Sequence, residues 1–122
     1  SIAQVRIQEA LDFKMNADTI IQNHPDEYTD ASIYNNVEDI YRKALVKLDD
    51  ALIDRDSLDA NVANMAIQQQ TAIKTALLDI YKNLDAGAEY VQEFRTRADA
   101  IKPLIEDLLE NQSNETINEE NN

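Results

Sequence analysis

A chain of 122 residues has the length of one ordinary domain with a single core. Its one glycine, two prolines and complete lack of cysteine exclude a disulfide framework, a thiolate metal site and a glycine-rich phosphate loop, and they favour helices over strands. The formal net charge of −13, from 24 acidic and 11 basic residues, argues against direct binding to nucleic acid. No apolar run is long enough for membrane insertion.

The first predicted helix runs from Ile2 to Gln22, where apolar residues recur every three or four positions. We expect it to end at Asn23-His24-Pro25, because a proline disfavours helical geometry in the residue before it and has no amide proton to donate. The stripe that faces the core is predicted to consist of Ala3, Ile7, Ala10, Phe13, Ala17, Ile20 and Ile21.

The second predicted helix begins after Thr29, whose hydroxyl is the best candidate for an N-cap. The polar cluster of residues 54–57 ends this helix, and we expect Asp56 or Ser57 to cap the next one. The apolar stripe of the second helix is the most regular in the chain: Ile33, Val37, Ile40, Tyr41, Ala44, Leu48, Ala51 and Leu52.

The third predicted helix carries an apolar stripe from Leu58 to Leu84, interrupted by Gln69. Gln69 either fixes the register of the bundle from a buried position or lies at the edge of the stripe with its amide in water, and we favour the edge. A break is predicted near residues 83–86, although the apolar pattern continues past Gly87 to Leu108.

These elements predict a soluble, all-α, up-and-down bundle of three to four antiparallel helices over residues 1–110. Residues 1–82 form the three-helix unit, and residues 86–110 form an additional or continuing helix that Pro103 is expected to kink or loosen. Residues 111–122 have one apolar residue and are predicted to be a disordered acidic tail or linker. Because the chain begins at Ser1 rather than at a methionine, we expect a fragment or a trimmed product.

A set of residues in the first three predicted helices follows the pattern of a known family. They are Tyr28-Thr29 and Ser32 at the entry to the second helix, Val37, Ile40, Tyr41, Ala44 and Leu48 within it, and Val62, Ala72-Ile73 and Ala76-Leu77 after an acidic turn. With these residues, the stretch 5–80 resembles the FIVAR module, a three-helix unit of bacterial surface and secreted proteins. The resemblance implies a spacer or attachment module of a multidomain extracellular protein.

The residue inventory predicts no catalytic, cofactor-binding or metal-binding residues. The single histidine, His24, precedes a proline, and such a position is typical of a helix end rather than of a catalytic triad. The acidic run from Asp54 to Asp59 lacks the central glycine and the late glutamate of a calcium loop.

A protein or glycan partner is the binding function that this inventory favours, with Tyr28, Tyr34 and Tyr90 as candidates for an exposed contact surface. We expect a monomeric, non-catalytic module at the bacterial cell surface or outside the cell. The alternative is a stand-alone, cytoplasmic acidic protein that mimics nucleic acid toward a basic partner, inhibits such a partner, or assembles with itself.

Overall fold

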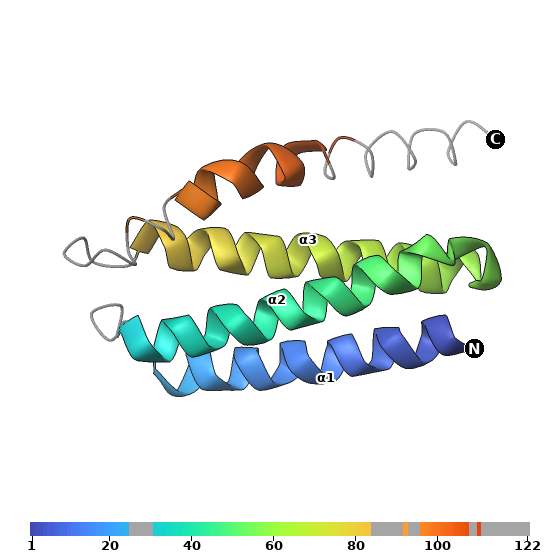
Figure 1. The fold of residues 1–122 in the computed structure, drawn as a ribbon, viewed down its shortest axis with the longest axis horizontal. Coiled ribbons are helices and arrows are strands. Elements are labelled where there is room, and N and C mark those ends of the chain that lie inside the picture. The colour runs from blue at the N-terminus through green and yellow to red at the C-terminus, as the bar shows by residue number, and fades with distance from the viewer. Residues whose placement is uncertain (25–30, 84–91, 93–95, 108–109, 111–122) are drawn as a thin grey trace.

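The protein is an all-α helical bundle whose helices run alternately up and down (Figure 1). The computed structural model describes residues 1–24, 31–83, 92, 96–107 and 110, and within these ranges it contains no strand. The helices are α1 (Ile2–Asn23), α2 (Ala31–Ile53) and α3 (Ala60–Asn83), and residues 96–107 form a further helical run. A turn that includes the 3₁₀ helix Arg55–Ser57 joins α2 to α3.

The ends of α1 follow from local hydrogen bonds. The Ser1 hydroxyl accepts from the backbone N–H of Gln4 at 3.2 Å, and the Gln4 side chain accepts from the amino terminus of Ser1, which is a complete capping box. At the other end the backbone N–H of His24 donates to the carbonyl of Ile21 at 3.0 Å. The predicted end of the first helix at residues 23–24 is therefore confirmed.

The start of α3 differs from the prediction. Leu58 has extended backbone angles and lies before the helix, so the chain turns once more before helical geometry begins. Asp59 accepts from the backbone N–H of Asn61 at 2.8 Å, in place of the predicted caps Asp56 and Ser57. Residues 55–57 themselves form a 3₁₀ turn, so neither Asp56 nor Ser57 lies directly before the first turn of α3. The prediction that one of them caps α3 was therefore wrong.

One hydrophobic core joins the helices, and it is built from the predicted stripes. Leu48, Ile73 and Leu77 are its largest fully buried aliphatic side chains. Ile40, predicted to lie in the core, is only partly buried at its edge. The remaining buried members are Ala3, Ile7, Ala10, Ala17, Tyr34, Val37, Tyr41, Ala44, Ala51, Ala66, Ile80, Tyr81 and Ala98.

Buried alanines recur at seven-residue spacing on α1 and α2. Ala3, Ala10 and Ala17 on α1 and Ala44 and Ala51 on α2 are all buried. Such small side chains let two helix backbones approach closely, and a seven-residue period keeps them on one face of each helix. The backbones of α1 and α2 approach each other more closely than those of α2 and α3.

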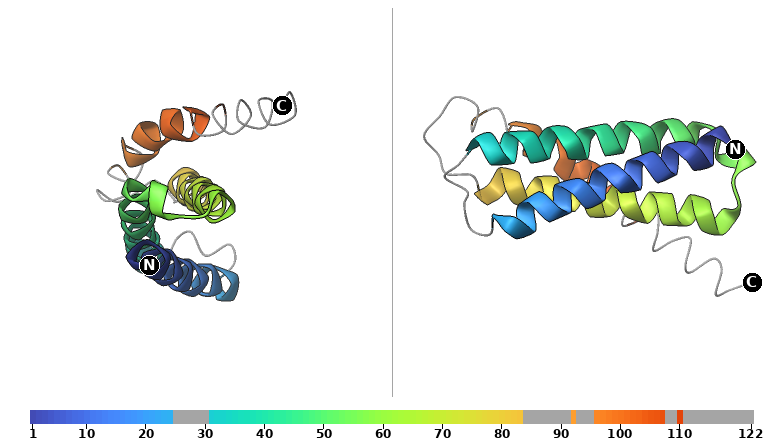
Figure 2. Two further views of the ribbon diagram at one scale, coloured as in Figure 1. Left: turned by 90° about the vertical axis from the view of Figure 1, so that its right-hand side faces the viewer. Right: turned by 90° about the horizontal axis from the view of Figure 1, so that it is seen from below.

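The helical run 96–107 lies against α2 and α3 on the side away from α1 (Figure 2). The chain direction reverses between Asn83 and this run, so the run is antiparallel to α3 (Figure 1). Pro103 lies within it and cannot donate a backbone hydrogen bond to the preceding turn. The predicted N-cap Thr29, residues 84–86 of the predicted break and the predicted tail 111–122 lie outside the described residues.

Truncation of Ile73, which is fully buried, should destabilise the protein by about 2–5 kcal/mol, since the lost methylenes leave a cavity in the core. Ile40→Ala should cost less, near the lower end of that range, because Ile40 is partly exposed. Met15→Ala, at an exposed site on α1, is the matched control and should change stability by less than about 0.5 kcal/mol. Urea unfolding followed by circular dichroism measures all three, and equal losses at Ile73 and Met15 would contradict the assigned core.

Candidate functional site

The most buried charged group in the described residues is the carboxylate of Glu38 on α2, which is 2% exposed. It forms ion pairs with two arginines from different parts of the chain. The Nη1 atom of Arg42, one turn further along α2, lies 3.3 Å from Oε1 of Glu38, and Arg97 of the helical run 96–107 pairs with the same oxygen. The two guanidinium groups compensate a charge that would otherwise be costly to bury.

Tyr81 of α3 completes this cluster. Its side chain is buried, and burial followed by the nearby negative charge of Glu38 raises the pKa of its phenol, while Arg97 and Arg42 act in the opposite direction. The cluster therefore brings together groups from α2, α3 and the run 96–107. Its groups hold three elements of the bundle together and are closed to solvent except at the arginines.

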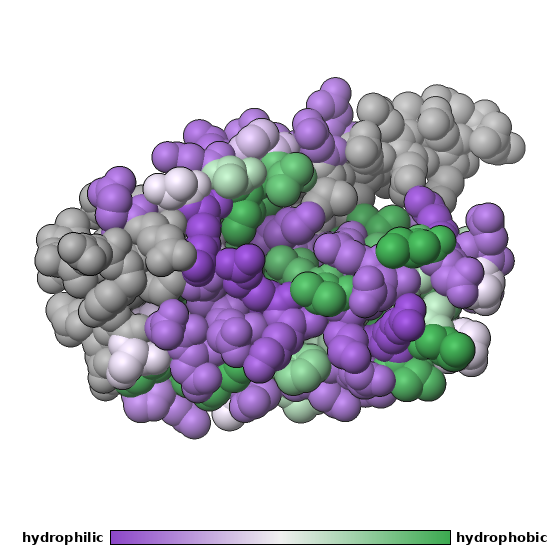
Figure 3. All heavy atoms as spheres, viewed as in Figure 1, coloured by the Kyte–Doolittle hydropathy of each residue, from purple (hydrophilic) through white to green (hydrophobic). Residues whose placement is uncertain are grey.

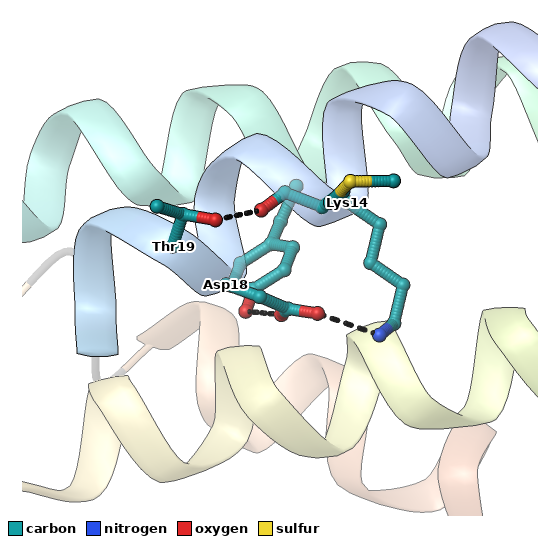
Figure 4. Close-up of polar contacts among 5 residues, drawn as sticks. Lys14, Asp18 and Thr19 are labelled. Carbon is teal, nitrogen blue, oxygen red and sulfur yellow. Dashed lines mark hydrogen bonds and ion pairs between the residues drawn. The ribbon is translucent and has the colours of Figure 1, made fainter.

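A second polar cluster joins α1 to α2 beside α3 (Figure 4). The hydroxyl of Tyr41 donates to Oδ1 of Asp18 at 2.5 Å, and Nζ of Lys14 lies 2.8 Å from Oδ2 of the same carboxylate. Burial, and then the hydrogen bond to Asp18 and its charge, raise the pKa of Tyr41 above the ordinary value of 10. Both oxygens of Asp18 are thereby engaged by side chains that belong to the bundle.

A third contact joins α2 to α3 through a glutamine. Gln70 is buried, and its Nε2 atom donates to Oδ1 of Asp49 at 2.6 Å. Gln69, the residue that the sequence singled out, is partly exposed, as the edge position predicts. Gln70, the next residue along α3, therefore fits the register-fixing role that was considered for Gln69.

Of the three tyrosines predicted as a contact surface, only Tyr34 lies within the described residues. Tyr34 is buried, and its hydroxyl donates to the backbone carbonyl of His24 at 3.0 Å, so it ties α2 to the end of α1. Its assignment to an exposed surface was wrong, because its position one turn before Val37 and Glu38 places it on the inner face of α2. Tyr28 and Tyr90 lie outside the described residues.

A hollow on the α1–α2 face offers a more accessible apolar surface. It has a volume of about 320 Å³ and is lined by Phe13 of α1 and by Asp39, Arg42, Lys43, Val46 and Lys47 of α2. Val46 is 57% exposed. Two of the basic groups at its rim are ion-paired, Lys43 with Asp39 at 3.0 Å and Lys47 with Glu9 of α1 at 2.7 Å.

The hollow therefore has an apolar floor, and the basic side chains at its rim are already ion-paired within the molecule. On the face shown in Figure 3, apolar side chains come to the surface in separate small areas among hydrophilic ones. No sequence signal pointed to the hollow, because Phe13 belongs to the predicted core stripe and Val46 does not.

Among the described residues, no three side chains of the types that bind metals gather at one place. His24 lies at the end of α1 with its backbone engaged at both the N–H and the carbonyl group. No helix in the described ranges is long and apolar enough to cross a membrane.

Comparisons with protein-family models, with curated proteins and with solved structures gave no match. The resemblance to the FIVAR module therefore stays a prediction from the residues that carry it.

The raised pKa values of Tyr41 and Tyr81 predict a loss of stability in alkali. Above about pH 10 these tyrosines ionise in the unfolded chain while they stay neutral in the folded one, so rising pH favours unfolding. Unfolding measured from pH 8 to pH 11 should show this loss, and Tyr41→Phe or Tyr81→Phe should each make it less steep. If both variants lost stability with rising pH as steeply as the unaltered chain, the assignment of this loss to Tyr41 and Tyr81 would be contradicted.

Proposed function

We propose that this chain is a non-catalytic helical module, a spacer or a protein- or glycan-binding unit, from a cell-surface or secreted multidomain protein of bacteria. The observation that carries the proposal is the use of the buried polar side chains. Glu38 and Gln70, which are buried, and Asp18, which is partly exposed, each bind a side chain of another helix or helical run. Polar groups used in this way fix the geometry of a bundle, as a spacer or a binding scaffold requires.

The contact surface of such a module is assigned to the hollow at Phe13 and Val46. Its floor is apolar and partly aromatic, and its rim carries hydrogen-bonding groups of both charges. An aromatic ring beside polar groups suits a protein side chain or the apolar face of a sugar. Because Lys43 and Lys47 are ion-paired within the molecule, binding there should depend on apolar contact more than on net charge.

The net charge of −13 favours a second candidate, a stand-alone acidic protein that binds a basic partner or assembles with itself. Attraction of this kind is long-ranged and is screened by salt, whereas apolar contact in the hollow is not. The two candidates therefore differ in their response to ionic strength.

The test is capture of partners from cell-wall extract, host matrix and cell lysate by the immobilised chain, at low and at high salt. We expect a partner that is retained at high salt and that binds at least tenfold more weakly to Val46→Glu, which places a charge in the apolar floor at an exposed site. Met15→Glu, equally exposed on α1 and outside the hollow, is the control and should bind normally. Capture of basic proteins alone, lost at high salt and unaffected by Val46→Glu, would support the acidic candidate instead.

A further inference from the structure

The helical run 96–107 packs against α2 and α3 (Figure 2), and the surface of these two helices that it covers is called the groove below. One face of the run is turned to the bundle: Ala98 and Ile105 are buried, and Ile101 packs against the core. These residues lie three or four positions apart, so they form a single stripe along the run. The rest of its surface is open, since Thr96, Asp99, Ala100, Lys102, Pro103, Leu104, Glu106 and Asp107 are all exposed.

The groove selects its occupant through the buried carboxylate of Glu38. Arg97 immediately precedes the stripe and supplies a guanidinium group to Glu38 beside the buried ring of Tyr81. If the helix in the groove had no cation at this position, Arg42 would be the only one of the two arginines left to compensate the charge of Glu38. The side chain of Arg42 is 55% exposed to solvent. The groove therefore has a recognition rule, an arginine followed by apolar residues one, four and eight positions later.

Among the described residues, the run 96–107 contributes fewer buried side chains to the core than α1, α2 or α3 does. Pro103 within it cannot donate a backbone hydrogen bond to the preceding turn. The core contributed by α1, α2 and α3 contains many side chains with no exposed surface at all, such as Val37, Leu48 and Ile73. Of the described helical segments, 96–107 thus removes the fewest buried side chains from the core when it leaves.

The geometry points to a helix-binding site in the α2–α3 groove that accepts residues 96–107 of a second copy of the chain in place of its own. A second copy is the occupant because its segment satisfies the recognition rule in full, and because an exchange between two copies restores every contact that it breaks. The inference does not depend on the proposed function, since it rests on the contacts of the run 96–107 and not on a ligand in the hollow.

Two full-length variants test this exchange. Glu38→Gln removes the carboxylate from the groove and keeps Arg97 in the segment 96–107. Arg97→Gln removes the guanidinium group from the segment and keeps Glu38 in the groove. When the two are unfolded, mixed and refolded together, we expect a mixed dimer, in which Arg97 of one chain meets Glu38 of the other. Sedimentation velocity should show association at least tenfold stronger in the mixture than for either variant alone.

Arg42→Gln is the matched control partner for Glu38→Gln. It also removes an arginine from Glu38, but from α2 and not from the exchanging segment, so the mixture should gain no dimer. Should a variant fail to fold alone, recovery of helical circular dichroism in the Arg97→Gln mixture, and not in the control mixture, replaces dimer formation as the readout. A mixture that stays monomeric and keeps the separate melting transitions of its components, or equal association in the control, would overturn the inference.

Discussion

The structure depends on a carboxylate that is enclosed by the bundle. Glu38 lies on the inner face of α2, where apolar side chains precede and follow it, and a charge in such a place must be compensated. Arg42 reaches it from the same helix, and Arg97 reaches it from a segment 59 residues away in the sequence. The need to compensate Glu38 thus determines where the run 96–107 docks.

Helix α2 is the element to which the others are attached, and it uses a different polar contact for each. Tyr41 binds Asp18 of α1, Asp49 accepts from Gln70 of α3, and Glu38 pairs with Arg97. Apolar stripes alone would allow helices to slide or exchange places at small cost, whereas a buried polar group is satisfied in only one arrangement. The apolar core supplies the stability, and these contacts set the order and register of the helices.

The helices could be predicted because their signals are local. The repeat of Ala3, Ile7, Ala10 and Ala17 is visible within a few turns, and so is the proline that follows His24. The polar contacts could not be predicted, because their partners lie far apart in the sequence and any of many acidic residues could meet any basic one. One signal was present: Glu38 falls between Val37 and Tyr41 within the predicted stripe, a position where a carboxylate is unexpected.

The two surfaces proposed to bind partners share a residue. Arg42 lines the hollow beside Val46, and its guanidinium group also pairs with Glu38 beneath the run 96–107. A ligand in the hollow that drew Arg42 outward would leave Arg97 as the sole compensating charge for Glu38, and the run would then be held more tightly. Such a ligand would link binding at the hollow to release of the run through one arginine, and by thermodynamic reciprocity each would oppose the other.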